Sequence, residues 1–185
     1  MRDSDHIARS ATLVSMPPRP SNERRQAWYA AVRAHGALTE VMEQQLEAEA
    51  GMSLGWYDVL VNLYLAPGHA LRMSELADAV LMSRSWLTRR IDQLERAGLV
   101  ERCSAGNDGR GVRARLTREG KRAYLKLERV HSSVIDAHFL PNATSAEAEV
   151  VQRVMNRVAA NARRELGRPE NVESAGLRPP ANPLG

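Results

Sequence analysis

The sequence has little of what several classes of protein require. It contains one cysteine, Cys103, so neither an intrachain disulfide nor a four-cysteine zinc site can form. Aromatic residues make up 4% of the chain, and 12 glycines and 9 prolines are few for 185 residues, which disfavours a sandwich or barrel of many strands. No apolar run approaches the roughly 20 residues of a membrane helix, and residues 1–22 lack the apolar core of a signal peptide. We therefore expect a soluble, cytoplasmic protein that does not bind a membrane.

Positive charge is concentrated in one part of the chain. The whole sequence carries a net charge of +4, whereas the 40 residues from Ser83 to Arg122 hold eleven basic and five acidic side chains, a net charge of +6. Such a segment is typical of a protein that binds a polyanion, although an arginine-rich face in contact with solvent gives the same count. The arrangement of the elements has to decide between these two interpretations.

Helical periodicity runs through most of the chain, between two ends that contain several prolines. Residues 1–22 are expected to form a flexible arm, and residues 168–185 a disordered tail. Between them, apolar residues recur every three or four positions, and serine, glycine and proline mark helix starts and stops. The expected helices run from 23 to 50, from a Ser53 cap to Pro67, from a Ser74 cap to 80 or 81, from a Ser83 cap to Gly98, from 118 to 138 and from 145 to 166.

The period changes after Gly98. Residues 99–103 and 112–116 are predicted to be two short strands, and the glycine-rich segment 106–111 is predicted to be the tip of the hairpin that joins them. Two short helices followed by a two-stranded hairpin are typical of a winged helix-turn-helix. The expected fold class is therefore mainly α with a small β-wing. Because the basic segment coincides with the second short helix and the hairpin, DNA is the favoured polyanion.

The helix after Ser83 is the candidate recognition helix. If Leu87, Ile91 and Leu94 face the core, the polar residues and one tryptophan project away from it, where arginine can bond guanine and serine or threonine can reach bases or phosphates. An alternative for Trp86 is packing on a neighbouring helix. At the hairpin tip, Asp108 could orient Arg110 toward a minor groove. The predicted DNA contacts are Ser83, Arg84, Ser85, Trp86, Thr88, Arg89, Gln93, Arg110 and Arg113.

The sequence resembles the MarR family of bacterial transcriptional regulators. The resemblance rests on LRMSELADAVLMSRSWLTRRIDQLERAGLVER at residues 71–102 and NDGRGVRARLTREGKRAY at residues 107–124. The family's Asp-x-Arg falls on Asp108 and Arg110, and its Leu-Thr-x-x-Gly falls on Leu116, Thr117 and Gly120. In element order it covers about residues 25–165. Trp86, where a small residue is common, and the long arm before Glu23 depart from the family pattern.

The resemblance implies a homodimeric repressor that binds a pseudo-palindromic operator in double-stranded DNA and is released by a small ligand or oxidant. It divides the chain into dimerisation helices at residues 23–52 and 118–167 and a winged helix-turn-helix DNA-binding region at residues 53–117. A stripe on the helix 118–138 would suit a partner helix; it consists of Tyr124, Leu127, His131, Val134 and His138.

A candidate effector site involves Asp58. Its helix is apolar on both sides, so the carboxylate must be paired or protonated, and Arg90 is a candidate partner. In a subgroup of the family that responds to urate and related anions, a Trp, an Asp and an Arg match Trp28, Asp58 and Arg90. Trp28 and Trp56, beside His35, could line a cleft for an aromatic or anionic effector. The alternatives are a purely structural pair of Asp58 with an arginine, and aromatic residues scattered in the core.

Other functions have weaker support in the sequence. Cys103 beside Arg102 could act as an oxidation sensor, but a passive cysteine is favoured. His131 and His138 lie seven residues apart, whereas one helix chelates a metal best at three or four, so no metal site is expected. No nucleophile elbow, phosphate loop or catalytic carboxylate pair is present, which argues against an enzyme and against a cofactor. A winged-helix protein-interaction module, such as an antirepressor, remains the alternative function.

Overall fold

The structure, a computed structural model, describes residues 22–80, 83–104 and 111–167. The chain forms two units, Met1–His35 and Gly36–Gly185, and the boundary falls inside the first helix. The arm, the tail and the hairpin tip expected from the sequence, with Asp108 and Arg110, lie outside the described residues except for Asn22, which begins a helix, and Gly111.

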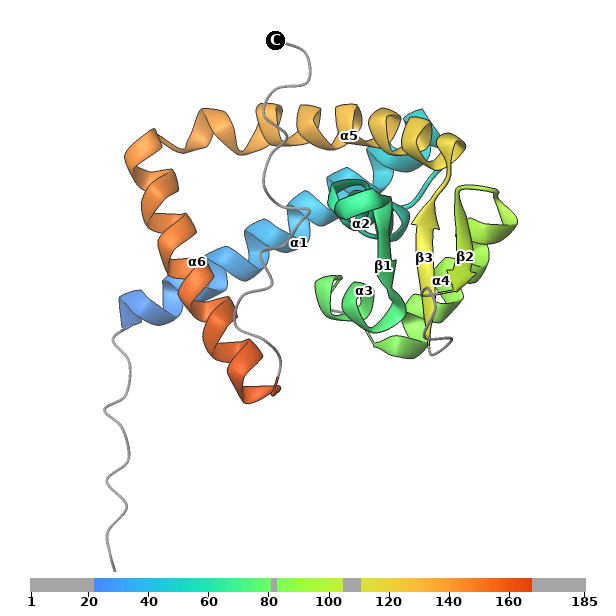
Figure 1. Cartoon of the computed structure of the whole chain (residues 1–185). Coiled ribbons are helices and arrows are strands. Elements are labelled where there is room, and N and C mark those ends of the chain that lie inside the picture. The colour runs from blue at the N-terminus through green and yellow to red at the C-terminus, as the bar shows by residue number, and fades with distance from the viewer. Residues whose placement is uncertain (1–21, 81–82, 105–110, 168–185) are drawn as a thin grey trace, which may run out of the picture. The chain divides into compact units, whose positions relative to one another are not determined.

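Six α-helices, two 3-10 turns and three strands make up the described chain (Figure 1). The second unit contains all of them except the N-terminal half of α1. The helices are α1 (Asn22–Ala50), α2 (Leu54–Leu65), α3 (Met73–Ala79), α4 (Arg84–Arg96), α5 (Arg118–His138) and α6 (Ser145–Glu165). The strands are β1 (Ala70–Arg72), β2 (Val100–Ser104) and β3 (Val112–Leu116), and the 3-10 turns are η1 (Pro67–His69) and η2 (Leu140–Asn142). The mainly α fold with a small β-wing is confirmed.

Side chains cap several helices where the sequence indicates a start. The Ser83 hydroxyl accepts a hydrogen bond from the backbone N–H of Trp86 at the start of α4. Thr144 and Glu147 form a capping box at the start of α6. Ser53 precedes α2 as expected, but its hydroxyl makes no capping hydrogen bond, and Glu43 instead accepts from the N–H of Leu54 at 2.7 Å.

The sheet has one strand that the sequence analysis does not predict. Its order is β1-β3-β2 and both pairings are antiparallel, with Leu71 opposite Ala114 and Arg102 opposite Ala114 on the other side. The three residues of β1 are too few to show an alternating pattern. They also displace the start of α3: the helix begins at Met73, and Glu75 accepts from the N–H of Arg72, so the expected Ser74 cap is wrong.

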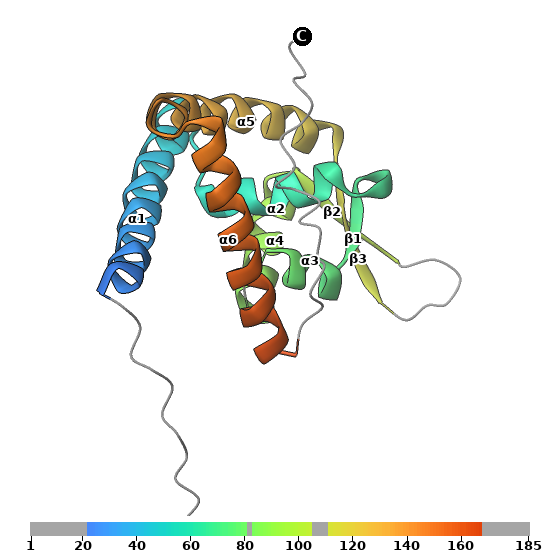
Figure 2. The same ribbon diagram turned by 90° about the vertical axis from the view of Figure 1, so that its left-hand side faces the viewer.

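Helix α2 occupies the centre of the second unit. Val59, Leu60 and Leu63 are fully buried, and they belong to one core with Leu87 and Ile91 of α4 and Leu127 of α5. In Figures 1 and 2, α5 lies along one side of α2, and α4 lies on the other side. A helix that is apolar around its whole circumference needs this kind of enclosure. The order α5, α2, α4 therefore separates the outer face of α5 from the recognition helix.

The stripe expected to meet a partner helix packs inside the chain instead. Tyr124, Leu127 and Val134 are at most 1% exposed, and Tyr124 stacks on Tyr64 of α2 at 4.3 Å between ring centroids. Apolar residues spaced three and four positions apart identify a buried face of α5. This spacing does not indicate whether the same chain or a second copy covers that face. Only His138 of the stripe is exposed.

A polar cluster joins α5 to α2 within this packed face. The Glu128 carboxylate accepts hydrogen bonds from the hydroxyls of Tyr57, Tyr124 and Ser132, and the His131 ring stacks on Tyr57 at 4.3 Å between centroids. Burial, together with the negative charge of Glu128, raises the pKa of both tyrosines, and burial lowers the pKa of His131. These groups hold α5 in register on α2.

Candidate nucleic-acid interface

Helix α4 presents a basic, polar face opposite its buried stripe. Leu87, Ile91 and Leu94 are at most 1% exposed, as the sequence predicts. Because successive residues turn by about 100° around a helix, the positions two and five residues from Leu87 point outward. The predicted contact residues of α4 and its cap that are exposed are Ser83, Arg84, Ser85, Thr88, Arg89 and Gln93.

Trp86 does not project from this face, so that expectation is wrong. It is only partly exposed and packs against the core, next to the start of α2: its ring lies 3.2 Å from where a Cβ on Gly55 would stand. The Arg90 guanidinium lies over the Trp86 ring at 5.1 Å. Trp86 is about a quarter-turn from Leu87, on the flank of the helix, so its long ring can reach the core. Gly55 leaves room for both side chains.

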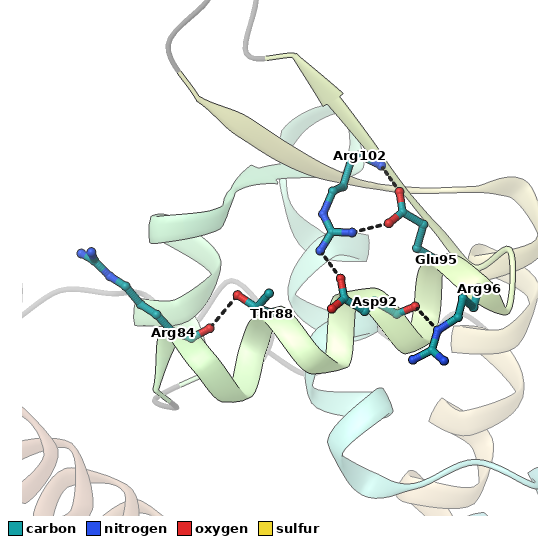
Figure 3. A network of polar contacts seen from close by, with 6 residues as sticks. All are labelled: Arg84, Thr88, Asp92, Glu95, Arg96 and Arg102. Carbon is teal, nitrogen blue, oxygen red and sulfur yellow. Dashed lines mark hydrogen bonds and ion pairs between the residues drawn. The ribbon is translucent and has the colours of Figure 1, made fainter.

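Arg102 ties the wing to the recognition helix (Figure 3). It lies on β2, and its guanidinium contacts Asp92 at 2.6 Å and also Glu95, while Glu95 accepts from its backbone N–H. The hydrogen bond to Asp92 raises the pKa of Arg102. One planar side chain thus bonds two carboxylates that stand on successive turns of α4. Sequence reasoning does not find this contact, because the pattern shows only an arginine among other arginines.

We expect Arg102→Gln to weaken operator binding more than it weakens the fold. Exposed ion pairs stabilise proteins by at most about 1 kcal/mol, whereas a wing that loses its fixed angle should lower operator affinity by roughly five- to tenfold. Arg115→Gln is the matched control, because Arg115 also pairs with a glutamate of the sheet, Glu101 at 3.4 Å. Chemical denaturation and fluorescence anisotropy measure the two quantities. Equal losses of affinity in both variants would show that only net charge matters.

The base of the wing is held by backbone contacts. Arg113 of β3 donates to the Ala70 carbonyl of β1 at 2.9 Å, so this predicted DNA-contacting residue is partly occupied within the sheet. Cys103 is half-buried, and its thiol faces the Arg113 carbonyl at 3.8 Å. Contact between Arg113 and DNA stays a prediction, as does contact through Arg110.

The family motif at the start of α5 has a structural explanation. The Thr117 hydroxyl accepts from the N–H of Gly120 and donates toward the carbonyls of Gly98 and Leu99. A Cβ on Gly120 would stand 2.0 Å from the Leu99 carbonyl oxygen. The threonine and the glycine therefore fix the junction between the wing and α5.

Two of the residues predicted for an effector site line one cavity. Trp56 and Arg90 face a cavity of about 530 Å³ between the C-terminal end of α1, the start of α2 and α4, together with Glu47, Ser53, Gln93 and Arg96. The Ser53 hydroxyl oxygen is buried without a hydrogen-bond partner among the described residues. Trp28 and His35 belong to the other unit, where both are exposed.

Asp58 does not pair with Arg90. Arg90 donates to Gln93 at 3.1 Å and lies over Trp86, and Asp58 is not among the residues that line the cavity. Burial, reinforced by the charge of Glu43, raises the pKa of Asp58 to about 6. Of the two possibilities for this carboxyl, paired or protonated, the structure supports a shift toward the protonated form.

Two features are absent from residues 22–80, 83–104 and 111–167. No helix there is long and apolar enough to cross a membrane. Nor do three or more His, Cys, Asp or Glu side chains gather there in a way that could hold a metal ion.

Comparisons with known proteins agree on one family. Residues 50–111 match the model of the MarR family. The HTH-type transcriptional regulator PrsX of Escherichia coli is 33% identical over 89 residues, which cover 48% of this chain and 53% of PrsX. The HTH-type transcriptional repressor YetL of Bacillus subtilis is 33% identical over 100 residues, 54% of this chain and 59% of YetL. The chain thus matches these curated relatives over little more than half their length.

Solved structures extend the likeness to most of the chain. Sco3205 of Streptomyces coelicolor, a MarR family regulator solved in complex with DNA, superimposes with a TM-score of 0.74 at 28% identity, over 80% of this chain and 92% of that one. AbsC of the same organism gives a TM-score of 0.73 at 28% identity, over 80% and 99% of the two chains. All four of these proteins are described as transcriptional regulators or repressors. The chain therefore resembles MarR family regulators, in sequence over residues 50–111 and in fold over 80% of its length.

Proposed function

We propose that the protein is a sequence-specific DNA-binding repressor that acts in the cytoplasm as a homodimer on a pseudo-palindromic operator. The observation that carries this proposal is the exposed face of α4, where Arg84, Arg89 and Thr88 stand beside a wing held in place by Arg102. Arginine on such a face can bond a guanine edge through two hydrogen bonds. The likeness to a regulator solved with DNA and to a named repressor supports the same function.

An exposed apolar face on α6 supports the dimer. Val150, Val151, Met155 and Val158 are 41–48% exposed and recur at helical spacing. In the other unit, Trp28 and Tyr29 are more than half exposed. Apolar side chains gathered on a helix face are typical of an interface. A two-fold dimer would read two half-sites about one helical turn of DNA apart.

The cavity beside α4 supports release by a small aromatic or anionic effector. Trp56 offers a flat apolar wall, and Arg90 and Arg96 offer positive charge. Arg90 also touches Trp86 and closely approaches Gly55, so an anion that draws Arg90 away would disturb the contact between α4 and α2. Release of bound operator by urate, salicylate and similar aromatic anions tests this part of the proposal; no release by any of them would contradict it.

Selection of bound duplexes from a random pool tests DNA recognition. We expect one palindromic site to be enriched, and we expect Arg89→Ala to relax the preference at one base position in each half-site by about 1–3 kcal/mol. Arg153→Ala on exposed α6 is the control for the loss of one charge. Enrichment of no sequence would favour the protein-interaction module instead. If Arg89→Ala lowers the affinity for all sequences equally, Arg89 contacts phosphates rather than base edges.

A further inference from the structure

A second basic surface lies on α5, away from the recognition helix. Arg118, Arg122 and Arg129 follow one another on the face of α5 opposite its buried stripe, and we call these three residues the basic ridge. The side chains of Arg118 and Arg122 are 83% and 65% exposed. Lys121 and Lys126 flank the ridge. The sequence analysis assigns the basic segment to the recognition helix and the wing. In the structure, part of this segment continues onto α5.

The positive charge of this surface is only partly neutralised. Glu119 contacts Arg122 at 2.8 Å and Arg118 at 3.8 Å. Glu128, the other carboxylate nearby, accepts hydrogen bonds from buried tyrosines. Within the described part of the chain, Arg129 and the two flanking lysines make no ion pair with a carboxylate. The surface thus keeps several positive charges for a ligand.

The ridge and the recognition helix cannot serve the same stretch of straight DNA. Helix α2 lies between α5 and α4, and Figures 1 and 2 both show α5 on the side of α2 opposite α4. The buried residues of α5 face α2, so the ridge, on the opposite face, points away from α4.

The chemistry of the ridge fits a nucleic-acid backbone better than a protein. Protein interfaces are centred on buried aromatic and apolar anchors, whereas the one large apolar side chain exposed on this part of α5 is Leu125, at 40%. A row of arginines over about 16 Å of helix spans several phosphates of a duplex, since each strand places one phosphate about every 3.4 Å along the duplex axis.

We propose that the basic ridge binds the phosphate backbone of a second DNA duplex while α4 holds the operator. This inference rests on the proposed function, because the operator complex brings the ridge among other DNA segments. Binding would be independent of sequence and strongly dependent on salt. The protein would then bridge two segments of DNA.

A two-duplex capture experiment tests the bridge. The operator selected in the experiment above is attached to beads. The full-length protein is then bound to this operator DNA, which is present in excess over the protein. A second, unrelated duplex with its own dye is then added at 50 mM salt. We expect capture by the wild type and at least a tenfold weaker capture by Arg122→Gln/Arg129→Gln, with operator affinity within twofold of wild type. Arg153→Gln/Arg157→Gln on α6 is the matched control for charge and should capture normally.

The salt dependence adds a quantitative check. Removing two phosphate contacts should reduce the slope of log affinity against log salt for the second duplex by about 1.8. Absence of capture by the wild type, or equal capture by the ridge variant, would overturn the bridge. Binding of polyglutamate in place of the duplex would assign the ridge to an acidic protein. The wild type could also bind an operator with long flanking DNA more tightly than a short operator, while the ridge variant binds both equally. That result would show that the basic ridge contacts the same duplex as α4.

The two proposals fail in different ways. If the protein does not regulate through an operator, no protein stays on the beads and the capture step cannot begin. If only the bridge is wrong, the beads retain protein but no second duplex.

Discussion

Replacing Gly120 by alanine is expected to lower the free energy of unfolding by about 3 kcal/mol, at the upper end of what overpacking costs. The added Cβ would stand 2.0 Å from the Leu99 carbonyl oxygen and 2.8 Å from a methyl carbon of Leu116. The nearer atom is backbone, which cannot rotate away. The start of α5 would have to move off the sheet, and the bond from Gly120 N–H to Thr117 would lengthen. Urea denaturation followed by circular dichroism measures the change.

Gly36→Ala is the matched control. Gly36 is also a helical glycine, in α1, but no atom lies within 4 Å of the Cβ that alanine would add. Alanine should therefore stabilise the helix there by roughly 0.5–1 kcal/mol, because it removes backbone freedom from the unfolded chain. A Gly120→Ala protein as stable as the wild type would mean that α5 and the wing are not in the close contact described.

Asp58→Asn is expected to stabilise the protein at pH 7.5, by at most about 3 kcal/mol, which is the cost of ionising a carboxyl whose pKa is raised to about 6. The pKa of Asp58 is raised from 3.8 to about 6 by burial first and by Glu43 second. The folded protein therefore binds the proton more tightly than the unfolded chain does. Stability falls as the pH rises from about 4 to about 6, and the full cost remains above that range. Asparagine carries no charge and avoids this cost.

The advantage of Asp58→Asn should disappear below pH 4, where aspartic acid is protonated in both states. Comparing variant and wild type at each pH cancels the contribution of His131, whose lowered pKa acts in the opposite direction. Asp136→Asn, on the exposed side of α5, is the control and should change stability by less than about 0.5 kcal/mol at any pH. Destabilisation by Asp58→Asn at pH 7.5 would instead reveal a cationic partner for the carboxylate.

The sequence predicts helices and buried faces that repeat a periodic pattern. It does not predict features that depend on the packing of a single side chain. The core stripe Leu87, Ile91 and Leu94 follows from periodicity and is buried as expected. Trp86 lies on the flank of the same helix, where the period allows either exposure or packing, and only the space above Gly55 settles the choice. The strand β1 is too short for any period to mark it.

Contacts between residues far apart in the sequence are the other feature that the sequence does not predict. Arg90 is correctly placed on the side of α4 that turns toward α2, but its partners are Trp86 and Gln93 rather than Asp58. A pairing between two charges can be imagined from any sequence that contains them; its geometry depends on how two helices cross. The buried face of α5 is likewise recognisable from the sequence, but the element that covers it is not.

The fork made by Arg102 restricts how this surface can change without losing its shape. Lysine would keep the charge, but an ammonium group is a compact point, which cannot bond two carboxylates on successive turns in one fixed plane. Such an exchange would leave the net charge and every side chain on the exposed face of α4 unchanged. Two relatives could then have the same residues on the exposed face of α4 and still hold their wings at different angles. Under the proposed function, both would bind the same half-site, but their wings would contact the flanking minor groove at different distances from it.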